Sequence, residues 1–409
     1  MNVNASIAAP SAIDGRQAWL RLAMCMVLGT IGSVGMWAIV VFLPAAQAEF
    51  GVSRADASLP YTMTMVGFAL GNVLIGRIVD RMGIAIPLAV AAVLLGLGFL
   101  AAAAAPVIWV LAAAQMLIGF GTGATFGPMM ADISRWFERR RGIAVSAAAS
   151  GNYLAGAIWP WIIYWGLEAH GWRVTCVGIG LFCIVTMVPL TWFLRGRAPD
   201  TLGASGAAPA QPKFSIDLTP RALQALLIVA GLGCCVAMSM PQVHIVAYCA
   251  DLGYGVARGA EMLSLMLAGG IVSRLASGFI ADRIGGVKTL LIGSVLQGLS
   301  LLLYIPFDGL ASLYIVSLVF GLAQGGIVPA YAIIVREYLP PREAGERIGI
   351  VIMATIAGMA IGGWLSGWIY DLTGSYSAAF LNGIAWNLLN ITVMVLILMR
   401  TRPRRPAFA

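Results

Sequence analysis

The sequence predicts an all-α membrane protein with twelve transmembrane helices, arranged as two pseudo-symmetric six-helix bundles. Three observations lead to this prediction: the composition, the spacing of the apolar segments, and a motif that recurs half a chain apart. Of the 409 residues, 60% are hydrophobic and only 10% are charged, whereas a soluble domain carries about 25% charged residues. Because so few charges cannot cover a water-facing surface, lipid is the expected main solvent. This composition excludes an ordinary soluble enzyme and a disordered chain.

Apolar segments follow one another along the chain, six on each side of a single break. A membrane helix needs about 20 apolar residues, so twelve fit within this length. The break is rich in Gly, Ala, Pro and Ser, which is typical of a linker. We therefore expect bundles over 21–195 and 221–399, a cytoplasmic linker over 196–220, and cytoplasmic tails over 1–20 and 400–409. The first apolar stretch is longer than the roughly 7–15 residues of a signal peptide's apolar region, so we interpret it as a retained span.

The basic residues indicate the topology. If the N-terminus is cytoplasmic, all but four of the 25 Lys and Arg residues fall in predicted inner segments. Arg54, Arg173 and Arg258 fall in predicted outer loops, and Arg274 lies within a span. This asymmetry follows the positive-inside rule and accounts for the net charge of +8 without nucleic acid. We expect a monomeric, multi-pass protein of a bacterial-type cell inner membrane, with both termini cytoplasmic.

A motif recurs at an offset of 202 residues. GRIVDRMG at 76–83 follows the second apolar segment, and GFIADRIG at 278–285 follows the eighth. Two copies in the same relative position predict two six-helix bundles related by a pseudo-two-fold axis.

This motif resembles the loop between the second and third helices of the major facilitator superfamily, and the resemblance extends over nearly the whole chain. In that family the charges of the loop hold the inner face closed. The resemblance therefore implies a conformational-gating role for Gly76, Asp80, Arg81, Gly83, Asp282 and Arg283. Ile84 and Ala85 stand where the family usually has basic residues.

Three further segments are similar to the monocarboxylate and oxalate transporter branch, particularly its bacterial members. They are RWFERRRGIA at 135–144, PQVH at 241–244 with ADLG at 250–253, and GWIYDLTGSY at 367–376. The resemblance implies a secondary active transporter that works by alternating access and carries a small organic anion. Monocarboxylate transporters have a substrate-binding Arg in the eighth helix, and the resemblance implies that Arg274 is this residue. They often have an Asp one turn earlier, where this chain has Gly270. Because the second embedded cation of the oxalate exchangers is absent, we expect a monocarboxylate.

Arg274 is also singled out by its position alone. An Arg within hydrocarbon costs at least about 2.5–3.5 kcal/mol on insertion scales, so it should face a wet cavity and an anion. Its planar guanidinium suits a carboxylate. The alternative is a side chain that extends to the inner interface, because Asp282 and Arg283 lie only two turns further on.

His244 is a second candidate, because histidine is the ordinary side chain that titrates near neutral pH. It could take part in the coupling of transport to protons, as in symport, or serve as a structural residue at a bend after Pro241. Other polar or aromatic residues at mid-span could shape a solute site, and the alternative for each is packing or hydrogen bonding between helices. They are Trp37, Tyr61, Asn152, Tyr153, Gln324, Tyr331, Trp364 and Asn387, with Thr64 and Asn72 as further members.

Other classes of protein are less consistent with the sequence. A membrane enzyme would need a metal site, a nucleophile with its base, or paired carboxylates at mid-depth, and no such constellation is present. We expect no metal and no cofactor, and six cysteines that stay reduced within helices. Two alternatives remain open: transport of a larger flat heterocycle such as riboflavin, and a membrane sensor or receptor built on a transporter fold.

Overall fold

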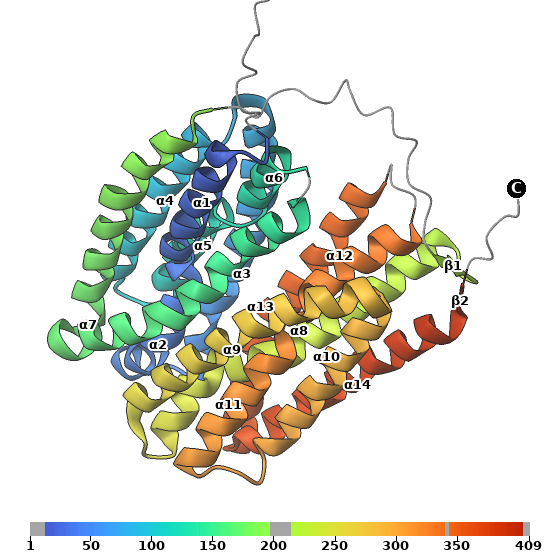
Figure 1. Cartoon of the computed structure of the whole chain (residues 1–409). Coiled ribbons are helices and arrows are strands. Elements are labelled where there is room, and N and C mark those ends of the chain that lie inside the picture. The colour runs from blue at the N-terminus through green and yellow to red at the C-terminus, as the bar shows by residue number, and fades with distance from the viewer. Residues whose placement is uncertain (1–12, 139, 197–213, 340–342, 404–409) are drawn as a thin grey trace, which may run out of the picture.

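The structure is a computed structural model that describes residues 13–138, 140–196, 214–339 and 343–403. Almost all of these residues are helical, and the helices form two bundles that lie side by side (Figure 1). The first bundle contains α1 (Arg16–Gly32), α2 (Val34–Phe50), α3 (Arg54–Met82), α4 (Ala85–Ala103), α5 (Ile108–Gly123), α6 (Gly127–Trp136), α7 (Arg141–Thr191) and the 3-10 turn η1 (Trp192–Leu194). The second contains α8 (Pro220–Asp251), α9 (Gly255–Ile284), α10 (Gly286–Leu303), α11 (Leu310–Gln324), α12 (Ile327–Tyr338), α13 (Ala344–Thr373) and α14 (Tyr376–Arg400).

The described residues contain eleven segments long and apolar enough to cross a membrane. One of them, Gly142–Leu194, has 53 residues, which as a helix would measure roughly 80 Å, far more than the roughly 30 Å of a bilayer core. It is two helices joined at Gly171, whose φ of 79° and ψ of 164° are not helical. The described part of the chain therefore has the twelve spans that the sequence predicts.

Local sequence explains where several helices begin and end. The Ser53 side chain accepts a hydrogen bond from the Asp56 backbone N–H (3.1 Å) and caps the start of α3. Thr219 caps α8 in the same way, and Pro220 occupies its first turn. The two copies of the repeated motif both end their helices at a glycine with positive φ, 82° at Gly83 and 85° at Gly285.

The internal repeat is also present in the packing. Gly119 lies against the backbone carbonyl of Thr64, and Gly321, 202 residues later, lies against that of Met266. At each place the absence of a side chain lets two helices approach closely. The same helix pairs are thus held together by equivalent contacts in both bundles.

Three of the spans are interrupted within the membrane. The first breaks at Ser33 between α1 and α2, the fourth at 124–126 between α5 and α6, and the tenth at 325–326 between α11 and α12. The last two breaks are related by the repeat. A break frees backbone groups that need partners inside the protein, since lipid offers none.

A short antiparallel ribbon departs from the all-α expectation. Strand β1 (Phe214–Ile216) pairs with β2 (Thr401–Pro403), with Ser215 opposite Arg402. β1 lies in the predicted linker and β2 in the predicted C-terminal tail. The domain boundaries given above stay predictions.

The two bundles meet mainly through α3 against α13 and through α7 against α9. We call the membrane side on which Gly196 and Phe214 lie the linker side. Figure 1 shows α6 and α12, which end on the linker side, standing apart from each other, whereas the bundles adjoin at the other side. All six cysteines are free and buried, as predicted.

Candidate substrate-binding site

Arg274 lies on α9 where the two bundles meet, and only 7% of it is exposed. Its Nη1 donates to the backbone carbonyl of Ala149 on α7 of the other bundle (3.0 Å), and its Nε donates to the carbonyl of Gly325 (3.3 Å). The guanidinium carbon lies 4.3 Å from the centre of the Tyr153 ring. None of the ion pairs among the described residues involves Arg274. Among the described residues, its positive charge is therefore met by carbonyl dipoles and by the Tyr153 side chain.

Tyr153 reaches Arg274 because residue 270 is a glycine. A Cβ at Gly270 would overlap the Tyr153 ring. An aspartate is often found at this position in the monocarboxylate branch, and here the aromatic ring takes the space beside the cation. The structure thus brings together Arg274 and Tyr153, two residues that were predicted separately as candidates for the solute site.

The repeat explains how Arg274 is positioned. Gly325, whose carbonyl it binds, lies at the break between α11 and α12. In the first bundle Asn72 occupies the equivalent position, and its Oδ1 accepts from the Gly127 backbone N–H (2.8 Å) at the break between α5 and α6. Each bundle therefore uses one polar side chain to satisfy a backbone group freed by a helix break. Only the second bundle uses a charged one.

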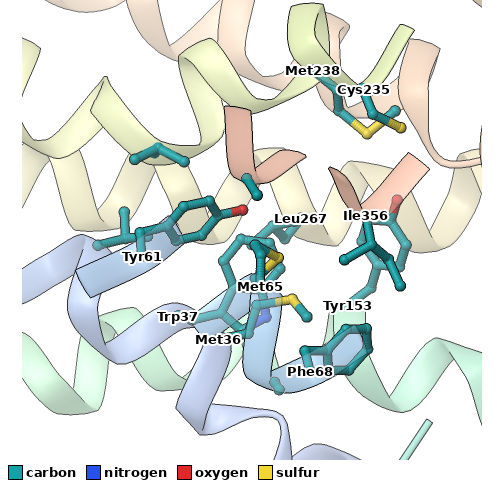
Figure 2. Close-up of a cluster of buried hydrophobic side chains, with 14 of the residues drawn as sticks. Met36, Trp37, Tyr61, Met65, Phe68, Tyr153, Cys235, Met238, Leu267 and Ile356 are labelled. Atoms are coloured by element: carbon teal, nitrogen blue, oxygen red, sulfur yellow. The ribbon is translucent and has the colours of Figure 1, made fainter. Parts of the chain in front are cut away.

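Trp37 and Asn152, two further candidates for the solute site, contact each other. The Trp37 indole Nε1 donates to Asn152 Oδ1 (3.0 Å), which ties α2 to α7. Next to them, buried apolar and aromatic side chains from both bundles fill the interface, as Figure 2 shows. The labelled members are Met36, Trp37, Tyr61, Met65, Phe68, Tyr153, Cys235, Met238, Leu267 and Ile356. The surroundings of Arg274 are thus largely apolar and aromatic.

Two buried polar groups near this interface are not fully bonded. Tyr61 is 0% exposed and its hydroxyl has no hydrogen-bond partner. Gln324 accepts from Gln242 Nε2 (2.7 Å), but its own Nε2 has no partner. Buried polar groups without partners are uncommon and call for an explanation, which a bound solute would provide.

Tyr331 and Asn387 lie elsewhere. The Tyr331 hydroxyl donates to Asn390 Oδ1 (3.1 Å), and Asn387 Nδ2 donates to the Ser294 carbonyl (2.8 Å). Asn390 also donates to the Ser294 hydroxyl (2.7 Å). These bonds link α10, α12 and α14 inside the second bundle, which matches the alternative of hydrogen bonding between helices.

Trp364 is half-buried and stacks on Trp368 of the same helix, with ring centres 6.2 Å apart.

His244 is fully buried on α8, away from Arg274 along the helix direction. Its Nε2 donates to the Gly363 carbonyl (2.8 Å), and the Tyr376 hydroxyl donates to its Nδ1 (3.4 Å). It therefore belongs to a group of side chains at the side opposite the linker.

That group contains an ion pair between the bundles that sequence reasoning missed. Arg54 Nη2, at the start of α3, lies 2.9 Å from Asp251 Oδ2 at the end of α8. Asp371 of α13 accepts from the backbone N–H groups of Arg54 (2.8 Å) and Ala55 (2.7 Å), the first turn of α3. The Arg54 guanidinium also lies 4.9 Å from the Tyr370 ring centre. We call Arg54, Asp251 and Asp371 the interbundle lock.

The sequence predicts Arg54 in an outer loop between spans, whereas in the structure it is only 6% exposed. Asp251 and Asp371 were noted only as parts of motifs that resemble a transporter branch. The available signal was that three charges stand at the ends of predicted spans on one membrane side. Which of them pair depends on tertiary contacts: Asp251 lies 197 positions after Arg54 in the chain, and Asp371 lies 317 positions after it.

The predicted gating residues lie on the linker side. Gly83 terminates α3, and Arg81 is exposed and makes interactions within the structure. Asp282 and Arg283 are exposed near the end of α9, and a Cβ added at Gly76 would lie at van der Waals distance from Pro128. The Asp80 side chain lies outside the described residues.

The buried acid Asp132 of α6 has a charged partner. Asp132 forms a buried ion pair with Arg21 (2.7 Å), whose Nη2 also donates to the Leu194 carbonyl (3.0 Å). The described residues contain no group of three or more His, Cys, Asp and Glu that could hold a metal ion.

Two repeated six-helix bundles, with a buried cation at their interface and helices that break at equivalent positions, define a polytopic membrane transport protein. The model of the Major Facilitator Superfamily matches residues 25–308 and 251–409. The chain belongs to this family of transporters, so the expectation of a transporter rather than an enzyme is confirmed.

Named relatives agree with the branch suggested by the motifs. The chain is 25% identical over 393 residues to monocarboxylate transporter 13 of Rattus norvegicus, covering 93% of this chain and 89% of that protein. It is also 25% identical over 388 residues to monocarboxylate transporter 11 of Homo sapiens, covering 90% and 80% respectively. Among solved structures, a mutant of the nucleoside transporter NupG matches with a TM-score of 0.73 and 13% identity, covering 93% of this chain and 99% of that one.

Proposed function

We propose that this protein is a secondary active transporter that moves a small monocarboxylate across the membrane by alternating access, with Arg274 as the binding residue for the carboxylate. The single observation that carries the proposal is the state of Arg274: a buried guanidinium at the bundle interface, with carbonyl and aromatic neighbours but no described anionic partner. A carboxylate bound there would supply the missing charge, and its two oxygens would fit the guanidinium edge.

The arrangement of the bundles supports the alternating-access part of the proposal. The interbundle lock holds the bundles together on the side opposite the linker, whereas α6 and α12 stand apart on the linker side (Figure 1). This is the arrangement of a transporter that takes up or releases solute on the linker side. We assign the linker side to the cytoplasm from the distribution of Lys and Arg, which places both termini there and the protein in a bacterial-type inner membrane.

Protons are our candidate coupling ion, and His244 is the candidate residue. It adjoins the interbundle lock through Tyr376, whose ring centre is 5.6 Å from its own. A change in its protonation would therefore act on the contacts that must open for alternation, rather than on the carboxylate beside Arg274.

A panel of solutes tests the proposal on purified protein. Thermal unfolding is followed with monocarboxylates, aromatic acids, dicarboxylates and riboflavin, for wild type, Arg274→Lys, and the control Arg336→Lys, which changes an exposed arginine of α12. Specific binding raises the melting temperature. We expect stabilisation by a monocarboxylate in wild type and control but not in Arg274→Lys, because lysine lacks the planar two-point geometry.

Two results would contradict the proposal. Equal stabilisation of Arg274→Lys by the monocarboxylate would remove Arg274 from the binding site. Stabilisation only by a neutral heterocycle would favour the alternative of a larger flat solute, which the aromatic and apolar surroundings of Arg274 also suit. Uptake of the stabilising solute into proteoliposomes then separates transport from sensing.

A further inference from the structure

A cavity of about 420 Å³ lies between α7 and α9, near the side opposite the linker. Because α7 belongs to the first bundle and α9 to the second, the cavity sits on the seam between them. It does not include Arg274 or the interbundle lock. Its lining residues are Ala157, Ile158, Trp161 and Ile162 of α7 with Glu261 and Ser264 of α9.

The cavity begins where close packing of the two helices ends. Deeper in the membrane Leu267 of α9 fills the notch left by Gly156 of α7, and Tyr153 covers Gly270. Further towards the start of α9, the two helices are separated by the cavity that Glu261 and Ser264 line.

One wall of the cavity is continuous with the lipid-facing surface. Ile158, Trp161 and Ile162 are 46%, 44% and 48% exposed. In a bilayer, apolar side chains exposed at this depth contact acyl chains. A hydrocarbon chain can therefore lie against this wall without any rearrangement of the helices.

The polar part of the lining consists of Glu261 and Ser264, and Arg258, one turn before Glu261, pairs with Glu261 from outside the lining. Glu261 accepts from Arg258 Nη1 (2.9 Å) and from the Tyr314 hydroxyl, and Arg258 keeps half of its side chain exposed. The Ser264 Oγ is buried and has no hydrogen-bond partner. Arg258 and Glu261 lie roughly 5–9 Å from the start of α9 at Gly255, and we expect lipid headgroups near this end of the span.

We propose that this cavity binds one phospholipid with a phosphoethanolamine headgroup, from the leaflet on the side opposite the linker. An acyl chain lies against Ile158 and Ile162. Arg258 binds the phosphate, Glu261 accepts hydrogen bonds from the primary ammonium, and Ser264 donates to an ester carbonyl. The adjacent positive and negative side chains match the adjacent phosphate and ammonium of this headgroup.

Such a lipid would contact both bundles at the end that must part during alternation. It would stabilise the arrangement in which that end is closed, since only there do α7 and α9 form the cavity together. This inference goes beyond the proposed function and does not depend on which solute is carried.

The test is lipid retention by delipidated full-length protein in detergent, measured by native mass spectrometry with added phosphatidylethanolamine, phosphatidylcholine or phosphatidylglycerol. We expect one phosphatidylethanolamine per protein, bound about tenfold more tightly than phosphatidylcholine, whose ammonium cannot donate a hydrogen bond. Glu261→Gln should remove this preference. Ala157→Phe should fill the cavity and abolish retention, whereas the control Ala101→Phe, at an exposed position of α4, should not.

Three outcomes would overturn the proposal: equal binding of all three lipids to wild type, retention by Ala157→Phe equal to wild type, and equal loss in Ala101→Phe. Because the measurement contains no solute, a negative result here is distinct from a failure of Arg274 to bind a carboxylate.

Discussion

The interbundle lock makes a direct prediction about which side of the membrane can open. Replacing Arg54 by glutamine removes the cation that joins the bundles at the side opposite the linker, while Asp251 stays partly buried without its partner. The Arg54 side chain is 8% exposed and that of Asp251 is 32% exposed. In its degree of burial, this contact is therefore intermediate between a buried ion pair and a surface ion pair.

These exposures set the expected magnitude. Breaking a fully buried pair costs about 3–5 kcal/mol, whereas an exposed pair is worth about 0–1 kcal/mol. We therefore expect the loss of Arg54 to shift the free-energy difference between the two states by about 1.5 kcal/mol, in favour of the state in which this side is open. That corresponds to about a tenfold increase in the population of the open state.

Thiol labelling measures this population. Ser58 is 0% exposed, one turn below Arg54, and the six native cysteines are buried. We expect Ser58→Cys to react with a maleimide about tenfold faster in Arg54→Gln than in the otherwise wild-type protein. Arg173→Gln is the matched control, because Arg173 pairs with Glu49 (2.7 Å) at the same membrane side but within one bundle.

Two results would refute this reasoning. An unchanged labelling rate in Arg54→Gln would show that the ion pair does not hold the interface closed. An equal increase in Arg173→Gln would show that any charge removed on this side has the same effect, independently of contact between the bundles.

Two further predictions concern stability. Arg21→Ala leaves Asp132 buried and unpaired, so the free energy of unfolding should fall by about 3–5 kcal/mol. The measurement is the melting temperature, which should fall in Arg21→Ala and be partly restored in the double variant that also carries Asp132→Leu. Gly270→Ala places a methyl group into the Tyr153 ring and should lower the free energy of unfolding by about 1 kcal/mol, after the gain in helix propensity. The control Gly278→Ala has open space around it and should be neutral or stabilising. The same melting curves check both variants.

The fold was predictable because its signals are local or periodic. Twelve apolar segments, the charge asymmetry and the repeated motif each follow from lengths and spacings along the chain. Arg274 was predictable for a similar reason: a charge in the middle of an apolar segment is costly wherever the segment lies. Its neighbour Tyr153 was predicted only as one polar aromatic residue among several.

The rest depends on contacts that sequence spacing does not encode. Nothing local distinguishes Tyr331, which bonds within the second bundle, from Tyr61, which lies at the interface. The break at Ser33 has no proline at that position, and the lock joins residues that are far apart in the chain. The lock follows from how the two bundles are placed against each other, and no local signal in the sequence marks the break at Ser33.

The use of Arg274 to satisfy the helix break at Gly325 affects how solute specificity can evolve. If Arg274 binds the solute as proposed, it cannot be exchanged freely, because its removal leaves the Gly325 carbonyl without this donor. The first bundle offers a template for such a change, since Asn72 supports the equivalent break from the equivalent position without any charge. Under the proposed function, a transition from charged to neutral cargo is therefore most accessible through an amide at position 274.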